Sequence, residues 1–99
     1  MGSRLVQRRL EDVQRQLAKA RESLAVLEEQ VVVWNDALDD GRIRALVSET
    51  PLQSREYEEL ARHVTVANAE MQRRSLEVRE LVKSRDEVLR EWTPRNDNG

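Results

Sequence analysis

The fold is decided by residues 3–39, SRLVQRRLEDVQRQLAKARESLAVLEEQVVVWNDALD. Apolar residues recur along this stretch at alternating intervals of four and three positions: Val6, Leu10, Val13, Leu17, Ala20, Leu24, Leu27, Val31, Trp34 and Leu38. This is the heptad pattern of a coiled coil, in which an under-wound helix keeps one apolar stripe against a partner helix. The stretch therefore predicts a long helix that needs a second helix to be stable.

A second heptad stripe in the other half of the chain supplies that partner. It consists of Tyr57, Leu60, Val64, Ala67, Met71, Arg74, Val78, Leu81, Arg85, Val88 and Trp92, and Ala61, Asn68, Ser75, Val82 and Leu89 widen it to one side. Thr50 is an expected N-cap, with Pro51 at the first helical position and Gln53 completing a capping box. We therefore expect a second helix over residues 51–92, followed by a flexible tail, 93–99.

The connection between the helices is expected to span residues 40–50. Asp39, Asp40 and Gly41 predict the end of the first helix, because a glycine adopts the left-handed conformation that follows many helices. A short helical turn then places Ile43, Leu46 and Val47 on one side, where Leu52 and Tyr57 are expected to cover them. The predicted fold is all-α, a single antiparallel coiled-coil hairpin over residues 1–92.

Two registers preserve the heptad phase of such a hairpin. If the numbers of facing residues sum to 91, Trp34 faces Tyr57 and Leu27 faces Val64; if they sum to 98, Leu27 faces Met71 and Val6 faces Trp92. We favour 98, because it gives Trp92 a partner. Arg74 and Arg85 occupy stripe positions, and we interpret them as register or specificity devices, with snorkelling at the stripe edge as the alternative.

A homodimer is expected, because a lone pair of helices buries little apolar surface against the entropy cost of ordering about 90 residues. Further apolar residues provide second faces for a four-helix bundle: Val26, Val32, Val33, Val66 and Leu76.

Composition excludes several function classes. The 99 residues include no cysteine, so disulfides, thiolate nucleophiles and Cys-ligated zinc are excluded. No apolar run reaches the roughly 18 residues that span a bilayer, and we expect a soluble, cytoplasmic protein without membrane association. Fifteen of the seventeen basic residues are arginine, which is typical of a GC-rich bacterial genome. His63, the only histidine, has only Glu59 at helical spacing, so we expect no metal, no cofactor and no catalytic site.

Acidic residues gather in one segment, residues 36–59, which we call the tip. Its seven acids outnumber Arg42, Arg44 and Arg55, which gives the tip a net charge of −4. We expect the chain to be a non-enzymatic interaction module that docks an unidentified protein through the tip or through a second apolar face. The candidate docking residues are Asp36, Asp39, Asp40, Ile43, Leu46, Glu49, Glu56, Tyr57 and Glu59.

Two alternatives remain open. The acidic tip is similar in outline to the coiled-coil arm of Gre-type transcript cleavage factors, although their tip motif is missing from DDGRIRALVSETPLQSREYEEL. This outline implies contact with RNA polymerase, and the alternative function is therefore a transcription-associated regulator that binds RNA polymerase or a sigma factor. The other alternative is nucleic-acid binding through basic residues near the chain ends, such as Arg4, Arg8 and Arg9. It is disfavoured, because acids are interleaved with these residues and weaken the field that phosphates need.

Overall fold

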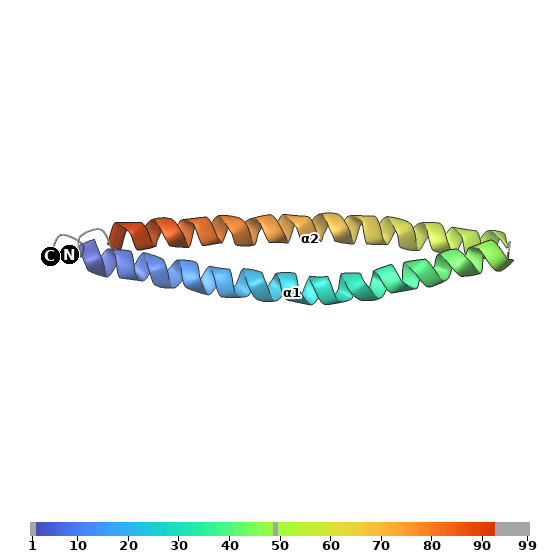
Figure 1. Cartoon of the computed structure of the whole chain (residues 1–99), viewed down its shortest axis with the longest axis horizontal. Helices are drawn as coiled ribbons and strands as arrows, with labels where there is room; N and C mark the ends of the chain where they lie inside the picture. The colour runs from blue at the N-terminus through green and yellow to red at the C-terminus, as the bar shows by residue number, and fades with distance from the viewer. Residues whose placement is uncertain (1, 49, 93–99) are drawn as a thin grey trace. The chain divides into compact units, whose positions relative to one another are not determined.

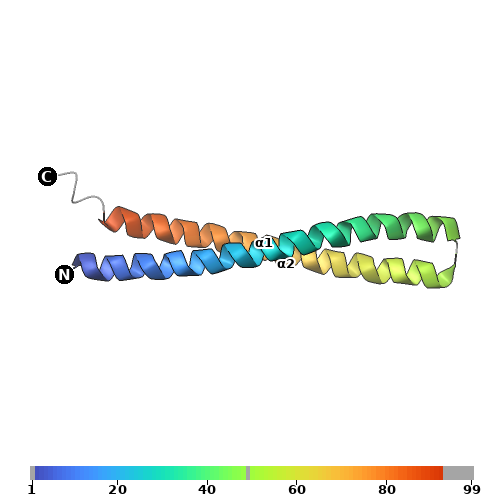
Figure 2. The ribbon, with the colours of Figure 1, turned by 90° about the horizontal axis from the view of Figure 1, so that it is seen from below.

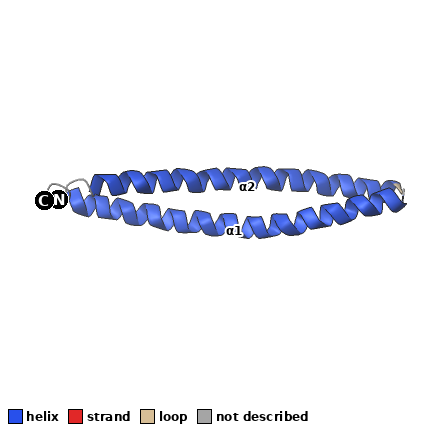
Figure 3. Ribbon diagram, in the orientation of Figure 1, coloured by secondary structure: helices blue, strands red, loops and turns tan. Residues whose placement is uncertain are grey.

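The computed structural model describes residues 2–48 and 50–92. These residues form two helices, α1 (Gly2–Ser48) and α2 (Pro51–Trp92), and no strand (Figures 1 and 3). Residues far apart in the sequence come together across the two helices: Ala67 joins Leu27 and Val31 in one buried cluster, and Arg9 pairs with Glu91. The predicted all-α antiparallel hairpin is therefore confirmed.

The chain divides into two compact units, each built from a segment of both helices. Unit 1 comprises Met1–Ser23 and Arg74–Gly99, and unit 2 comprises Leu24–Arg73, which contains the helix connection. In unit 1, Leu17, Ala20 and Val88 are buried. In unit 2, Leu27, Val31 and Ala67 form a buried cluster against which Trp34 and Met71 pack.

Burial follows the predicted heptad stripe in α1. All ten stripe residues from Val6 to Leu38 are buried or half-buried. Between residues 3 and 40, the only other residue that is not exposed is Asn35, whose side-chain amide donates a hydrogen bond to the Val31 carbonyl at 2.9 Å. In α2, the stripe residues from Tyr57 to Val88 and the five widening residues are likewise buried or half-buried, whereas Trp92 is exposed.

The predicted end of the first helix near Asp39 is wrong, because α1 continues to Ser48. Gly41 and Ala45 are half-buried and extend the stripe beyond Leu38 by the same intervals of three and four. Apolar packing therefore continues past the two aspartates and favours the helix there. Gly41 lies inside this helix and is not a left-handed terminal residue. The predicted cap also fails, because Ile43, Leu46, Val47 and Leu52 are exposed.

Contacts between the helices agree with the register in which the numbers of facing residues sum to 98. In unit 2, Tyr57 lies against Gly41, and the Trp34 ring meets His63. The alternative register, with a sum of 91, places Tyr57 opposite Trp34 and is therefore wrong. In unit 1, Arg9 and Glu91 form an ion pair, and their residue numbers add up to 100, which is two more than 98.

Thr50 caps the start of α2 as predicted. The backbone N–H of Gln53 donates to Thr50 Oγ1 at 3.3 Å, and the N–H of Ser54 donates to the Thr50 carbonyl at 3.2 Å. These bonds satisfy N–H groups that the first turn of a helix leaves without intrahelical partners. α1 ends at Ser48 and α2 begins at Pro51. The last turns of α1 lie next to the first turns of α2 in both Figures 1 and 2.

Candidate functional site

The tip carries a group of aliphatic side chains that the hairpin does not cover. Their exposed fractions are 58% for Ile43, 72% for Leu46, 79% for Val47 and 62% for Leu52. For Ile43, Leu46 and Val47 the reason is heptad position, since the stripe in this part of α1 runs through Leu38, Gly41 and Ala45. Leu52 lies in the first turn of α2. We call these four residues the aliphatic patch.

Acidic side chains accompany the aliphatic patch within the tip. Of the predicted docking residues, Asp36, Asp39, Asp40, Glu56 and Glu59 are all exposed. Glu49 lies outside the described residues. Because α1 continues to Ser48, the three aspartates lie in the body of the helix, and their charges do not oppose the dipole of its C-terminus as the sequence had indicated.

A shallow hollow in the tip brings three of the predicted residues together. Its volume is about 250 Å³, and it is lined by Ala37, Asp40, Gly41, Arg44, Gln53, Glu56, Tyr57 and Leu60. Asp40 and Glu56 thus come from different helices to one place, with the half-buried Tyr57 between the helices. Arg44 also lines the hollow and places a positive charge near these carboxylates. It was not among the docking residues predicted from the sequence.

The tip therefore combines exposed aliphatic side chains with exposed carboxylates. None of the described residues is both polar and buried. A surface of this kind suits the docking of a protein that offers an apolar groove with basic residues at its rim, because apolar contact and charge complementarity then act together.

Comparisons with protein families, with curated proteins and with solved structures found no match. Neither helix contains, within the described residues, a segment that is long and apolar enough to cross a membrane.

His63 lies beside an aromatic ring on the other helix. The ring centroids of His63 and Trp34 are 4.4 Å apart, and the planes meet at 77°. This is the edge-to-face arrangement that aromatic rings prefer. Among residues 2–48 and 50–92, no three histidine, cysteine or acidic side chains gather where a metal ion would bind. The imidazole thus contributes to packing against the Trp34 indole.

The two arginines of the α2 stripe differ in what they contact. Arg74 Nη1 donates a hydrogen bond across the hairpin to the Ser23 carbonyl at 3.2 Å. Arg85 instead pairs with the carboxylate of Asp86, its neighbour in sequence, at 3.3 Å. Arg74 therefore has the contact that a register device needs, since its bond joins α2 to one particular carbonyl of α1. The bond of Arg85 stays within α2.

Basic residues near the chain ends are partly neutralised. Arg9 Nη1 forms an ion pair with Glu91 at 3.0 Å, and Arg15 forms one with Asp12 at 3.1 Å. These pairs weaken the positive field that phosphate binding requires.

Sequence reasoning missed Val47 and Leu52 as exposed residues and Gly41 and Ala45 as stripe residues. A signal for the stripe was present, because the spacing of three and four continues from Leu38 through Gly41 to Ala45. Extending the stripe to these small residues places Ile43, Leu46 and Val47 off it, and hence in solvent.

Proposed function

We propose that this chain is a non-enzymatic coiled-coil interaction module that docks a protein partner through its tip. The observation that supports this function best is the exposure of the aliphatic patch, Ile43, Leu46, Val47 and Leu52. Single exposed aliphatic residues are common on protein surfaces, but a group of them is typical of an interaction site. Four lie here within ten residues of sequence, at the end of one helix and the start of the next.

The energy available from the patch is large enough for docking. Full burial of a Val, Leu or Ile side chain contributes about 1.5–3 kcal/mol. Association loses translational and rotational freedom, so only part of this gain remains as affinity. The exposed carboxylates of the tip add electrostatic attraction to a basic partner and accelerate encounter at low salt. A partner with an apolar groove and a basic rim therefore fits the tip best.

The test is retention of partner proteins by the immobilised chain from the cells that express it, with matched variants. We expect the double variant Leu46→Ser/Val47→Ser to lose at least about 90% of a specifically retained protein. Leu5→Ser is the matched control, because Leu5 is also exposed, at 61%, but lies in unit 1. Circular dichroism confirms that each variant remains helical.

Two results contradict this function. In the first, the tip variant and the control retain the same proteins in the same amounts. In the second, no protein is retained by the unsubstituted chain in preference to an unrelated coiled coil. Recovery of a sigma factor or RNA polymerase through the tip supports the alternative of a transcription regulator.

A further inference from the structure

Apolar and acidic side chains alternate along one side of α1 in unit 2. Val33, Asp40 and Val47 follow one another at intervals of seven positions, and all three are exposed. Residues seven apart lie on the same side of a coiled-coil helix, about 10 Å from one another along its axis. This side of α1 therefore presents an aliphatic side chain, then a carboxylate, then a second aliphatic side chain.

The same alternation occurs on α2, where Leu52, Glu59 and Val66 are also seven positions apart and exposed. Because facing residues of unit 2 have numbers that sum to about 98, the two rows lie at matching heights along the unit. They form three pairs, each with a sum of 99: Val33 with Val66, Asp40 with Glu59, and Val47 with Leu52. An acidic pair thus lies between two apolar pairs, which are about 21 Å apart.

The hollow in the tip shows that both rows lie on the same side of unit 2. Asp40, from the row on α1, lines this hollow together with Glu56 of α2. Leu52 is four positions before Glu56 and Glu59 is three positions after it, so both are its neighbours on the surface of α2. The two rows therefore flank the hollow, one row on each helix.

Charge on this side of unit 2 is mainly negative. Asp40, Glu56 and Glu59 supply three exposed carboxylates, against the one guanidinium of Arg44. Within the described chain, none of these carboxylates takes part in an ion pair. Unit 2 as a whole has five basic and ten acidic residues, a net charge of −5. Charge complementarity therefore favours a basic partner and disfavours unit 2 of a second copy, because like charges repel.

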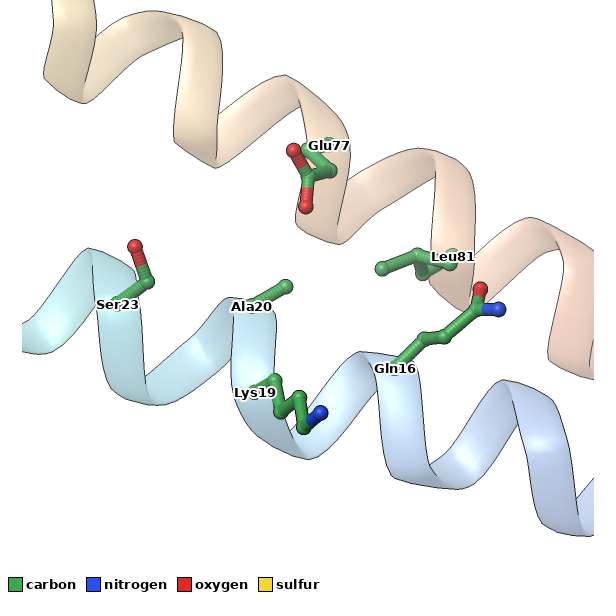
Figure 4. Close-up of a pocket in the computed structure, with 6 residues that line it drawn as sticks. All are labelled: Gln16, Lys19, Ala20, Ser23, Glu77 and Leu81. Carbon is green, nitrogen blue, oxygen red and sulfur yellow. The ribbon is translucent and has the colours of Figure 1, made fainter.

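Unit 1 has a hollow of its own between the helices, without such apolar pairs (Figure 4). Its volume is about 500 Å³, and it is lined by Gln16, Lys19, Ala20, Ser23, Glu77 and Leu81. Continued at intervals of seven, the two rows reach Lys19 and Glu80 in this unit, and both residues are charged. The combination of a hollow with aliphatic side chains around it is therefore a property of unit 2.

A helix fits this side of unit 2 better than an extended segment does. The described part of unit 2 contains no strand, so no sheet edge offers backbone groups to an extended peptide. The two apolar pairs are two heptads apart. An amphipathic helix repeats its apolar residues at this interval and can carry charged residues between them.

We propose that this side of unit 2 binds a basic amphipathic helix of the partner. Its apolar residues contact the two apolar pairs, and its central cations lie over the carboxylates of Asp40, Glu56 and Glu59. The inference rests on the proposed function, because Val47 and Leu52 belong to the aliphatic patch. It extends the docking surface from the tip to Val33 and Val66, and it specifies the order of apolar and basic residues in the partner.

The test uses two synthetic peptides of about three heptads, each held helical by a covalent cross-link on its polar face. The first peptide has leucines in its outer heptads and lysines in the central one. The second has the same composition with the lysines moved to one end. We expect the full chain to bind the first peptide at least about tenfold more tightly in fluorescence anisotropy, because only its order matches the apolar and acidic pairs.

Matched variants of the full chain locate the bound peptide. We expect Val33→Ser and Val66→Ser each to weaken binding of the first peptide at least about fivefold, because each removes part of an apolar pair. Val32→Ser is the control and is expected to leave the affinity unchanged. Val32 is exposed to a similar extent, 60% against 64% for Val33, but lies on another side of α1. Circular dichroism confirms that each variant remains helical.

Three results overturn the proposal: equal binding of the two peptides or none of either, equal affinity of the Val33→Ser and Val32→Ser variants, and self-association of the chain that Val33→Ser abolishes. The third result, measured by sedimentation equilibrium, means that a second copy covers this side. Failure here is distinguishable from failure of the proposed function. If Leu46→Ser/Val47→Ser loses the retained protein while the peptides do not bind, the tip docks a partner without this helix.

Discussion

Gly41 of α1 lies against the ring of Tyr57 of α2. A methyl group added at Gly41 would stand 3.8 Å from Tyr57 Cδ1, which is an ordinary van der Waals distance. The glycine is therefore a stripe residue at a helix–helix contact, and it lies seven residues before the end of α1 at Ser48. This contact distinguishes the observed hairpin from one in which the first helix stops at Asp39.

Gly41→Ala is expected to stabilise the protein. Alanine is favoured over glycine inside a helix by about 0.5–1 kcal/mol, and the new methyl group gains contact with Tyr57. Urea unfolding measures the change, with Ala45→Gly as the matched control that is expected to lose a similar amount. A lower stability of Gly41→Ala means that residue 41 adopts the left-handed conformation of a helix end.

Leu17→Ala is expected to destabilise the chain by about 3 kcal/mol, because it removes a fully buried side chain and leaves a cavity. Leu17 is 1% exposed, the lowest value among the buried residues of the core. Leu76→Ala removes the same atoms from an exposed position and is expected to cost less than about 1 kcal/mol. Equal losses for the two variants, measured by thermal unfolding, contradict the assignment of Leu17 to the core.

His63→Ala is expected to uncover the Trp34 indole, since the two rings meet edge to face. The loss of this contact costs about 0.5–1.5 kcal/mol. In a Trp92→Phe background the fluorescence reports Trp34 alone, and its emission maximum is expected to shift to longer wavelength. His63→Phe preserves an aromatic contact and is expected to preserve the emission. An unchanged spectrum in His63→Ala shows that the two rings are not in contact in solution.

Arg74→Leu is expected to leave the free energy of unfolding unchanged or higher, because leucine packs better in an apolar stripe. Polar residues at such positions favour one register at a cost in stability. The variant is therefore expected to populate a second register, which the hydrogen bond from Arg74 to the Ser23 carbonyl normally disfavours. Paired cysteines detect this register by disulfide formation. If only the native pairs are cross-linked in the variant, Arg74 does not select the register.

The helices themselves were predictable because the heptad pattern is a local and repeated signal. Each stripe residue from Val6 to Leu38 supports the same helix face, so no single exception alters the prediction. The start of α2 at Pro51 was predictable for a similar reason, since its cap depends on three nearby residues, Thr50, Pro51 and Gln53. The end of α1 was not predictable from sequence. Asp39, Asp40 and Gly41 locally favour the end of a helix, whereas packing against α2 favours its continuation. Packing across the hairpin favours helix there, and this depends on the register as well as on neighbouring residues.

The candidate site was only partly predictable. The acidic character of the tip follows from composition, and Ile43 and Leu46 were assigned to it from sequence. Their exposure was not foreseen, because the predicted cap assumed that apolar side chains near a connection cover one another. Where α1 continues as a regular helix, Ile43, Leu46 and Val47 lie off the stripe and more than half of each side chain stays exposed.

In unit 2, the heptad stripes of α1 and α2 meet in the register in which the numbers of facing residues sum to 98. Disulfide formation in two double variants tests this register, because the chain contains no cysteine of its own. Leu27→Cys/Met71→Cys is expected to close rapidly into an intramolecular disulfide, whereas Leu27→Cys/Val64→Cys is expected to remain largely reduced. Rapid closure of the second pair with the first pair reduced would contradict the hairpin described here.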